Sequence, residues 1–154
     1  MTGPLVITDT TVLIGLDRIG RLDVLPALYP DIVAPPAVVA EFGSLPDGWR
    51  IVPVADPARA AALALYKLDP GECEAIALAQ EHAGSLLLID ERRGRRYAIA
   101  AGLRVVGAAG VLIQAKQSGV VENVRPLLDA LRANGFHLSD TVYRQALALA
   151  GESD

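Results

Sequence analysis

The stretch Leu5-Val6-Ile7-Thr8-Asp9 decides the fold class, together with a second stretch of the same design, Leu86-Leu87-Leu88-Ile89-Asp90. Each is a short, largely apolar run that ends in an aspartate. Short apolar runs of this kind are typical of parallel strands that are buried on both faces. Both carboxylates are therefore predicted at the carboxyl ends of strands, the edge where open α/β sheets bind ligands and carry out catalysis.

Strands and helices alternate along the rest of the chain. Further strands are predicted at 32–34, 50–54 and 104–106, and the second of these is an edge strand because Pro53 lacks the N–H that a sheet ladder needs. Asp69-Pro70-Gly71-Glu72 predicts a helix start with an N-cap, proline at the first helical position and a capping-box acid. The first helix is predicted to follow Asp9, with Thr10 or Thr11 as its N-cap. Further helices are predicted at 21–28, 37–42 and 57–66, from 70 to near 84, and at 92–101, 107–116, 124–133 and 141–150. This alternation predicts an α/β fold in three layers, α/β/α, with a short parallel sheet of about five strands.

Length and composition bound the class of protein. The 154 residues suit one domain spanning residues 1–154. No stretch approaches the ~20 apolar residues that a membrane-spanning helix needs, and the N-terminus lacks the features of a signal peptide. The single cysteine, Cys73, excludes an internal disulfide and favours a cytoplasmic location.

Four acids are candidates for a metal site: Asp9, Glu41, Glu74 and Asp90. Gathered carboxylates need a counter-charge to stay ionised, and a divalent cation, Mg²⁺ or Mn²⁺, is the usual one. The alternative for Asp9 is an N-cap of the following helix. Glu72 and Glu74 lie about 200° apart around a helix and cannot both face the site. We assign Glu74 to the metal and Glu72 to the capping box.

Positive charge is concentrated just after Asp90. The formal net charge of −4 gives no general attraction for nucleic acid, so phosphate binding requires a local patch. Arg92, Arg93, Arg95 and Arg96 supply one, and the alternative is a solvated helix face. Arg93 and Arg96 share a helix face, and we predict that they bind substrate together with the hydroxyls of Thr10 and Thr11.

Several segments in order resemble the PIN domain superfamily, closest to a small prokaryotic branch. They are Thr8-Asp9-Thr10-Thr11, Val38-Val39-Ala40-Glu41, Gly71-Glu72-Cys73-Glu74-Ala75-Ile76-Ala77-Leu78-Ala79, Leu88-Ile89-Asp90-Glu91, Gly94-Arg95-Arg96, Gly102-Leu103 and Gly110-Val111-Leu112. The resemblance covers nearly the whole chain. It implies a metal-dependent ribonuclease, with Asp9, Glu41, Glu74 and Asp90 as the acidic quartet. It also implies RNA as substrate and, as in many small PIN toxins, a cognate antitoxin as partner.

Two departures from the PIN pattern stand out. The third acid is glutamate where many PIN domains have aspartate. An acid that usually follows the last one by a few residues is replaced here by arginines.

Other kinds of chemistry find little support in the sequence. His82 and His137 are isolated, too few nitrogen and sulfur ligands exist for zinc, and no glycine-rich nucleotide loop follows a strand. Two alternatives to an active ribonuclease remain open. One is a catalytically weak PIN-like module that acts through protein association, including homodimerisation through apolar helices. The other, more remote, is a doubly wound domain that binds a small anion.

Overall fold

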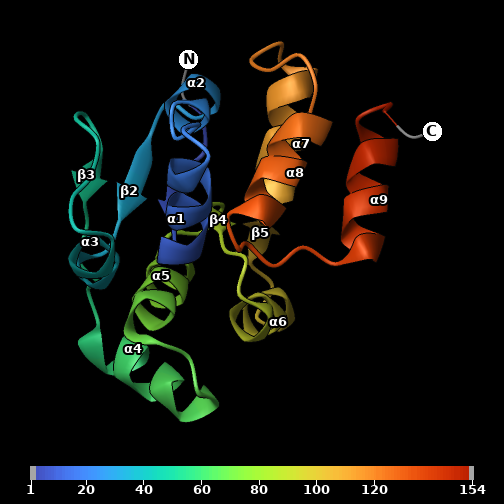
Figure 1. The fold of residues 1–154 in the computed structure, drawn as a ribbon. Coiled ribbons are helices and arrows are strands. Elements are labelled where there is room, and N and C mark those ends of the chain that lie inside the picture. The colour runs from blue at the N-terminus through green and yellow to red at the C-terminus, as the bar shows by residue number, and fades with distance from the viewer. Residues whose placement is uncertain (1–2, 153–154) are drawn as a thin grey trace.

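Five parallel strands form the centre of the computed structural model, which describes residues 3–152 (Figure 1). Along the chain the strands are β1 (Val6–Thr8), β2 (Ile32–Ala34), β3 (Arg50–Ile51), β4 (Leu86–Leu88) and β5 (Arg104–Val106). Their order in the sheet is β3-β2-β1-β4-β5. The chain therefore builds the sheet outward in one direction from β1 and later returns to add β4 on its other side. The predicted α/β fold with five parallel strands is confirmed.

Helices connect the strands and cover both faces of the sheet. They are α1 (Thr10–Arg18), α2 (Val24–Leu28), α3 (Pro36–Phe42), α4 (Pro57–Leu63), the 3-10 turn η1 (Ala64–Tyr66), α5 (Pro70–Glu81), α6 (Arg92–Ala100), α7 (Ala108–Gln117), α8 (Arg125–Ala133) and α9 (Asp140–Leu149). Each helix lies close to its predicted range. The main exception is α2, which begins at Val24 and not at residue 21, because the preceding residues form i to i+3 turns through Arg21 and Leu22.

Strand residues alternate between two hydrophobic cores. Val6 and Leu88 point into a core formed with α1, α2, α7, α8 and α9, whereas Ile7, Leu87 and Ile89 point into a core formed with α4, α5 and α6. This alternation follows from the two-residue period of a strand. β1 and β4 are buried at every position, which explains why all of their residues except Thr8 are apolar and makes the sheet the middle of three layers.

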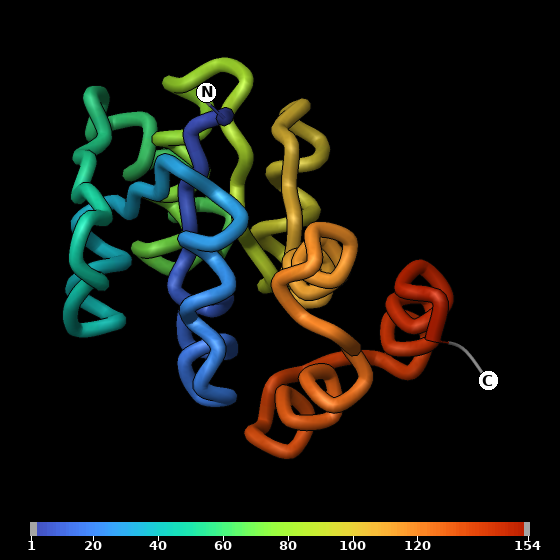
Figure 2. The backbone as a smooth tube through the Cα atoms, turned by 90° about the horizontal axis from the view of Figure 1, so that it is seen from above, coloured from blue at the N-terminus to red at the C-terminus, as the bar shows by residue number. Residues whose placement is uncertain are grey.

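The two C-terminal helices lie at one end of the molecule. Figures 1 and 2 both place α8 and α9 on the side of α7, away from β3. Ser139 caps α9 by accepting a hydrogen bond from the Val142 amide at 3.1 Å. Within residues 3–152, none of the helices combines the length and apolar character required to cross a bilayer.

Candidate active site

Asp9 and Asp90 follow neighbouring strands at the point where the strand order reverses. β1 pairs with β4 in register from Val6 with Leu86 to Thr8 with Leu88, and the Asp9 amide donates to the Leu88 carbonyl at 2.9 Å. The crevice at such a switch point is where open α/β sheets bind their ligands. The topology therefore brings together two acids that are far apart in the sequence.

Asp9 is completely buried and uses only one of its oxygens. Oδ1 accepts a hydrogen bond from the Val12 amide at 3.1 Å, so Asp9 is the N-cap of α1, and the prediction that Thr10 or Thr11 caps this helix is wrong. Oδ2 accepts no hydrogen bond. Burial raises the pKa of Asp9 well above its ordinary value; the Val12 hydrogen bond opposes this, and the charges of Asp90 and Glu72 add to it.

Glu72 completes the predicted capping box of α5. Its Oε1 accepts from the Asp69 amide at 3.0 Å, while Asp69 Oδ1 accepts from the Glu72 amide at 2.8 Å. The other oxygen, Oε2, is buried without a hydrogen-bond donor and packs against Gly94. Burial raises the pKa of Glu72 to about 8, and the neighbouring carboxylate of Glu91 contributes to the rise. One glutamate therefore caps a helix and also presents a second, unpartnered carboxyl oxygen in the neighbourhood of Asp9.

Asp90 is held by the first turn of α7. Its Oδ2 accepts a hydrogen bond from the Ala108 amide at 2.7 Å. Gly107 precedes that amide, and a Cβ placed on it would lie 2.3 Å from Asp90 Oδ1, so the carboxylate occupies the space of the missing side chain. Burial raises the pKa of Asp90, and the Ala108 hydrogen bond and the charge of Arg95 oppose that rise.

The other two predicted acids, Glu74 and Glu41, lie on α5 and α3. Glu74 is half-buried and its Oε1 accepts from the Ala37 amide at 2.9 Å, which ties α5 to the first turn of α3. Glu41 is exposed on α3. Within residues 3–152, no three His, Cys, Asp or Glu side chains are grouped closely enough to form a ready-made metal site. Asp9 lies close enough to Asp90 and to Glu72 for both charges to raise its pKa, while Glu74 is engaged by the Ala37 amide and Glu41 is exposed.

Unpartnered buried oxygens are confined to one place in the part of the chain described. They are Asp9 Oδ2, Thr10 Oγ1 and Glu72 Oε2. Thr10 follows Asp9 in the chain, and Gly71 precedes Glu72. A Cβ on Gly71 would lie 3.1 Å from Thr10 Oγ1, so these two pairs of residues are neighbours in space. Hard oxygen atoms are the ligands that Mg²⁺ and Mn²⁺ prefer, and Mg²⁺ is often held by only one or two carboxylates with water filling its other positions. The residues present fit such a cation.

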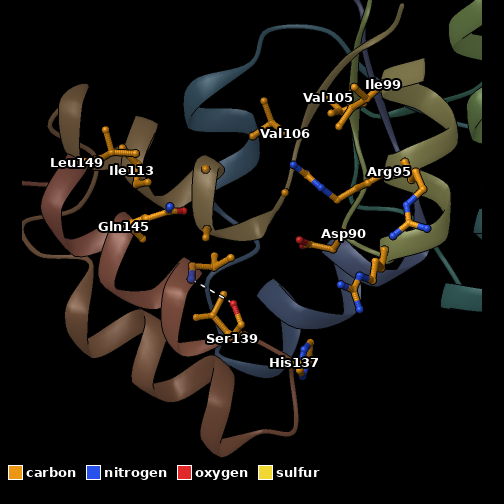
Figure 3. A pocket seen from close by; sticks show the side chains of 18 of the residues that line it. Asp90, Arg95, Ile99, Val105, Val106, Ile113, His137, Ser139, Gln145 and Leu149 are labelled. Atoms are coloured by element: carbon orange, nitrogen blue, oxygen red, sulfur yellow. Dashed lines mark hydrogen bonds between the residues drawn. The ribbon is translucent and has the colours of Figure 1, made fainter. Parts of the chain in front are cut away.

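Two pockets meet at Asp90. The larger, of about 1040 Å³, is a groove between α6, β5, α7 and α9, and Figure 3 shows Asp90 and Arg95 in it with the apolar side chains of Val105, Ile113 and Leu149. The smaller, of about 460 Å³, lies beside α1. Asp90, Arg92 and His137 line both pockets.

The predicted substrate-binding residues divide between these surfaces. Arg96 lines the groove, whereas Arg93 turns away and donates to the Lys67 carbonyl at 3.4 Å. Thr11 lines the smaller pocket, and Thr10 is buried beside Asp9. The sequence assigns Glu72 to the capping box alone, which the structure confirms for one of its two oxygens, and gives no role to His137, which lines both pockets. A capping-box glutamate uses one carboxyl oxygen for the cap, so the sequence could have indicated that the second oxygen of Glu72 is free for another contact. Nothing in the sequence indicates that His137 lies near Asp90.

A family described as a PIN domain matches residues 5–152 of the chain. The chain belongs to the PIN domain family. PIN domains are generally nucleases that use divalent metal ions and act on nucleic acid. No curated protein and no solved structure shows significant similarity to this PIN domain.

Proposed function

We propose that residues 1–154 form one PIN domain that acts as a Mg²⁺- or Mn²⁺-dependent endoribonuclease. The observation that carries the proposal is the set of buried oxygens without donors at Asp9 and Glu72, beside Asp90 at the switch point of the sheet. Buried charge that no protein group neutralises is costly, so such a site favours a bound cation. Membership of the PIN family supports nuclease chemistry at that site.

Asp9 and Asp90 are the proposed central metal ligands, and Glu72 adds a third buried carboxylate. Glu74 and Glu41, which the PIN resemblance adds to the acidic set, lie on the adjoining helices α5 and α3. A bound divalent ion supplies a water of lowered pKa and stabilises the leaving oxygen in phosphodiester hydrolysis.

The side chains around these acids orient them and bind substrate. The amides of Val12 and Ala108 each hold one oxygen of an aspartate, which fixes the direction of the other oxygen. Thr10 and Thr11 follow Asp9 directly, and Arg92 and Arg96 line the pocket walls next to Asp90, where they contact RNA phosphates.

Cleavage of a fluorescent single-stranded RNA with MnCl₂ or EDTA tests the proposal. Asp9→Asn should reduce Mn²⁺-stimulated cleavage on the order of 100-fold or more, because removing one preorganised charge at the reacting centre has an effect of that size. In EDTA the same variant should melt at a higher temperature than the wild type, since a buried charge is removed. The matched control is Asp17→Asn, on the exposed end of the same helix.

Two results would contradict the proposal. One is Mn²⁺ at millimolar concentration leaving the melting temperature of the unmutated protein unchanged, because a ligand that binds only the native state must stabilise it. The other is equal cleavage by wild type and Asp9→Asn.

The biological setting proposed is a cytoplasmic toxin paired with an antitoxin protein, in which the nuclease forms a homodimer. Many small PIN domains act in such pairs, as the resemblance implies. A short gene for a DNA-binding or disordered protein next to the gene for this chain would support the pairing.

The second candidate function is protein association by a catalytically weak domain. The observation that favours it is the groove, because three of its apolar lining residues, Ile99, Val142 and Leu149, are exposed to solvent by 56%, 41% and 69%. Contiguous exposed apolar surface is typical of interaction sites. Under this function, Val142→Asp should abolish self-association measured by sedimentation, and purified wild type should lack metal-dependent cleavage.

A further inference from the structure

Arg95 folds back over the end of β4. It lies on α6 and is half-buried, and its Nη1 donates to the carbonyl of Ile89, the residue before Asp90, at 3.1 Å. This hydrogen bond holds the guanidinium at the mouth of the site. Arg93 on the same helix instead reaches Lys67 on the other side.

Gly107 brings Arg95 and Asp90 to the same point. A Cβ on this glycine would lie 2.3 Å from Asp90 Oδ1 and 3.2 Å from Arg95 Nη1. The carboxylate and the guanidinium therefore both crowd the space left by the missing side chain. Figure 3 shows the two side chains pointing into the same groove.

A fixed guanidinium changes how many cations the site can hold. Arginine stays charged at every physiological pH. Two-metal nucleases hold their cations about 3.5–4 Å apart, bridged by carboxylates. A second cation beside Asp90 would meet the positive charge of Arg95. The acid nearest in sequence, Glu91, is engaged as the N-cap of α6 through the Gly94 amide at 2.9 Å.

We infer that Arg95 replaces a second metal ion. The site binds one divalent cation, and the guanidinium of Arg95 contacts the scissile phosphate on the side opposite that cation. The inference rests on the proposed function. It assigns a catalytic role to the position where this chain has arginines and many PIN domains have an acid. A guanidinium is suited to this role because its planar donors match phosphate oxygens and stabilise charge that develops in the transition state.

The test is the number of Mn²⁺ ions bound per chain, measured by calorimetry and by counting free Mn²⁺ with paramagnetic resonance. Wild type should bind one ion. Arg95→Met should still bind one ion at least as tightly, because a positive charge is removed, while kcat for cleavage falls on the order of 100-fold. Arg95→Glu should bind two ions, and Arg95→Lys should recover part of the lost kcat. Arg59→Met, at an exposed arginine on α4, is the matched control, with unchanged binding and cleavage.

Each contrary result has a clear meaning. Two ions per wild-type chain, or unchanged kcat in Arg95→Met, would overturn the inference and leave the proposed function standing. Loss of Mn²⁺ binding and a lower melting temperature in Arg95→Met would also overturn it, because Arg95 would then only support the structure. A folded wild type that neither binds Mn²⁺ nor cleaves RNA would overturn the proposed function, and the inference with it.

Discussion

Asp9 and Glu72 each divide their two oxygens between structure and site. One oxygen accepts a backbone amide at the start of a helix, and the other is buried without a donor. The backbone hydrogen bond fixes the side chain, so the second oxygen has a defined direction before any ligand arrives. The sequence leaves open whether Asp9 caps a helix or binds a ligand. With one oxygen for each role, Asp9 is able to do both.

The raised pKa of Glu72 predicts that the metal-free protein loses stability as pH rises. A pKa of about 8 in the folded state, against an ordinary value of 4.5, means that the neutral form stabilises the fold. That contribution is complete below pH 4.5 and is lost as pH rises through about 8. In EDTA the melting temperature should fall on the order of 5 °C between pH 5.5 and 8.5, and Glu72→Gln should remove most of this fall.

Thermal unfolding at several pH values measures the effect of Glu72→Gln. A residual slope is expected, because burial raises the pKa of Asp9 in the same direction. Glu81→Gln is the control, since hydrogen bonds from the Ala55 and Asp56 amides lower the pKa of Glu81, so this residue titrates below the tested range. A pH-independent melting temperature in the wild type would refute the prediction.

At the scale of elements, the first turn of α7 positions Asp90. The backbone of Gly107 has φ −93°, which any residue adopts, so a substitution there acts by collision and not by backbone strain. Gly107→Ala should weaken Mn²⁺ binding by about 10–100-fold, as changes to groups that orient a metal ligand do. It should also cost about 1–3 kcal/mol of stability, as overpacking does.

Gly110→Ala is the matched control for Gly107→Ala. Its Cβ would lie 2.9 Å from the Val106 side chain, so it crowds α7 without touching Asp90. Calorimetry should find normal Mn²⁺ affinity in this variant despite a lower melting temperature. An equal loss of affinity in both variants would mean that general disturbance of α7, and not displacement of Asp90, weakens the site.

The elements were predictable because their causes are local. Apolar runs specify β1 and β4, and Asp69-Pro70 with Glu72 specifies the start of α5. The site was only partly predictable, because its geometry depends on contacts between elements. Gly107 lies against Asp90, Glu74 accepts a hydrogen bond from the Ala37 amide, and His137 lines both pockets. These contacts result from the packing of elements and are not encoded in the periodicity of the sequence.

At the scale of the whole molecule, Glu152 ties the end of the described chain to two helices. Its carboxylate accepts from Lys116 Nζ on α7 at 2.8 Å and from the amides of Val124 at 2.7 Å and Arg125 at 3.1 Å at the start of α8. Burial alone would raise the pKa of Glu152, but these hydrogen bonds outweigh it and lower the pKa to about 2.

Glu152→Gln should destabilise the protein by about 1–2 kcal/mol at pH 7, because charge-assisted hydrogen bonds are lost. Since the folded pKa is depressed, the stabilisation is present above pH 4.5 and is lost as pH falls towards about 2. Urea unfolding of both proteins should therefore give a difference that disappears near pH 2, whereas exposed Glu122→Gln should match the wild type throughout. A difference that persists in acid would show that the carboxylate charge is not responsible.

The position of β4 beside β1 also has a consequence in time. Val6 pairs with Leu86, so a growing polypeptide contains Asp9 well before Asp90, and Asp9 lacks this neighbouring acid until β4 and the residue after it have left the ribosome. Contacts between strands so far apart in the sequence form late in folding, after the local helices. A nascent chain that ends before Leu86 therefore lacks the strand pairing that brings Asp9 and Asp90 together. Under the proposed function, such a chain would not cleave the message that encodes it until β4 and Asp90 have been made.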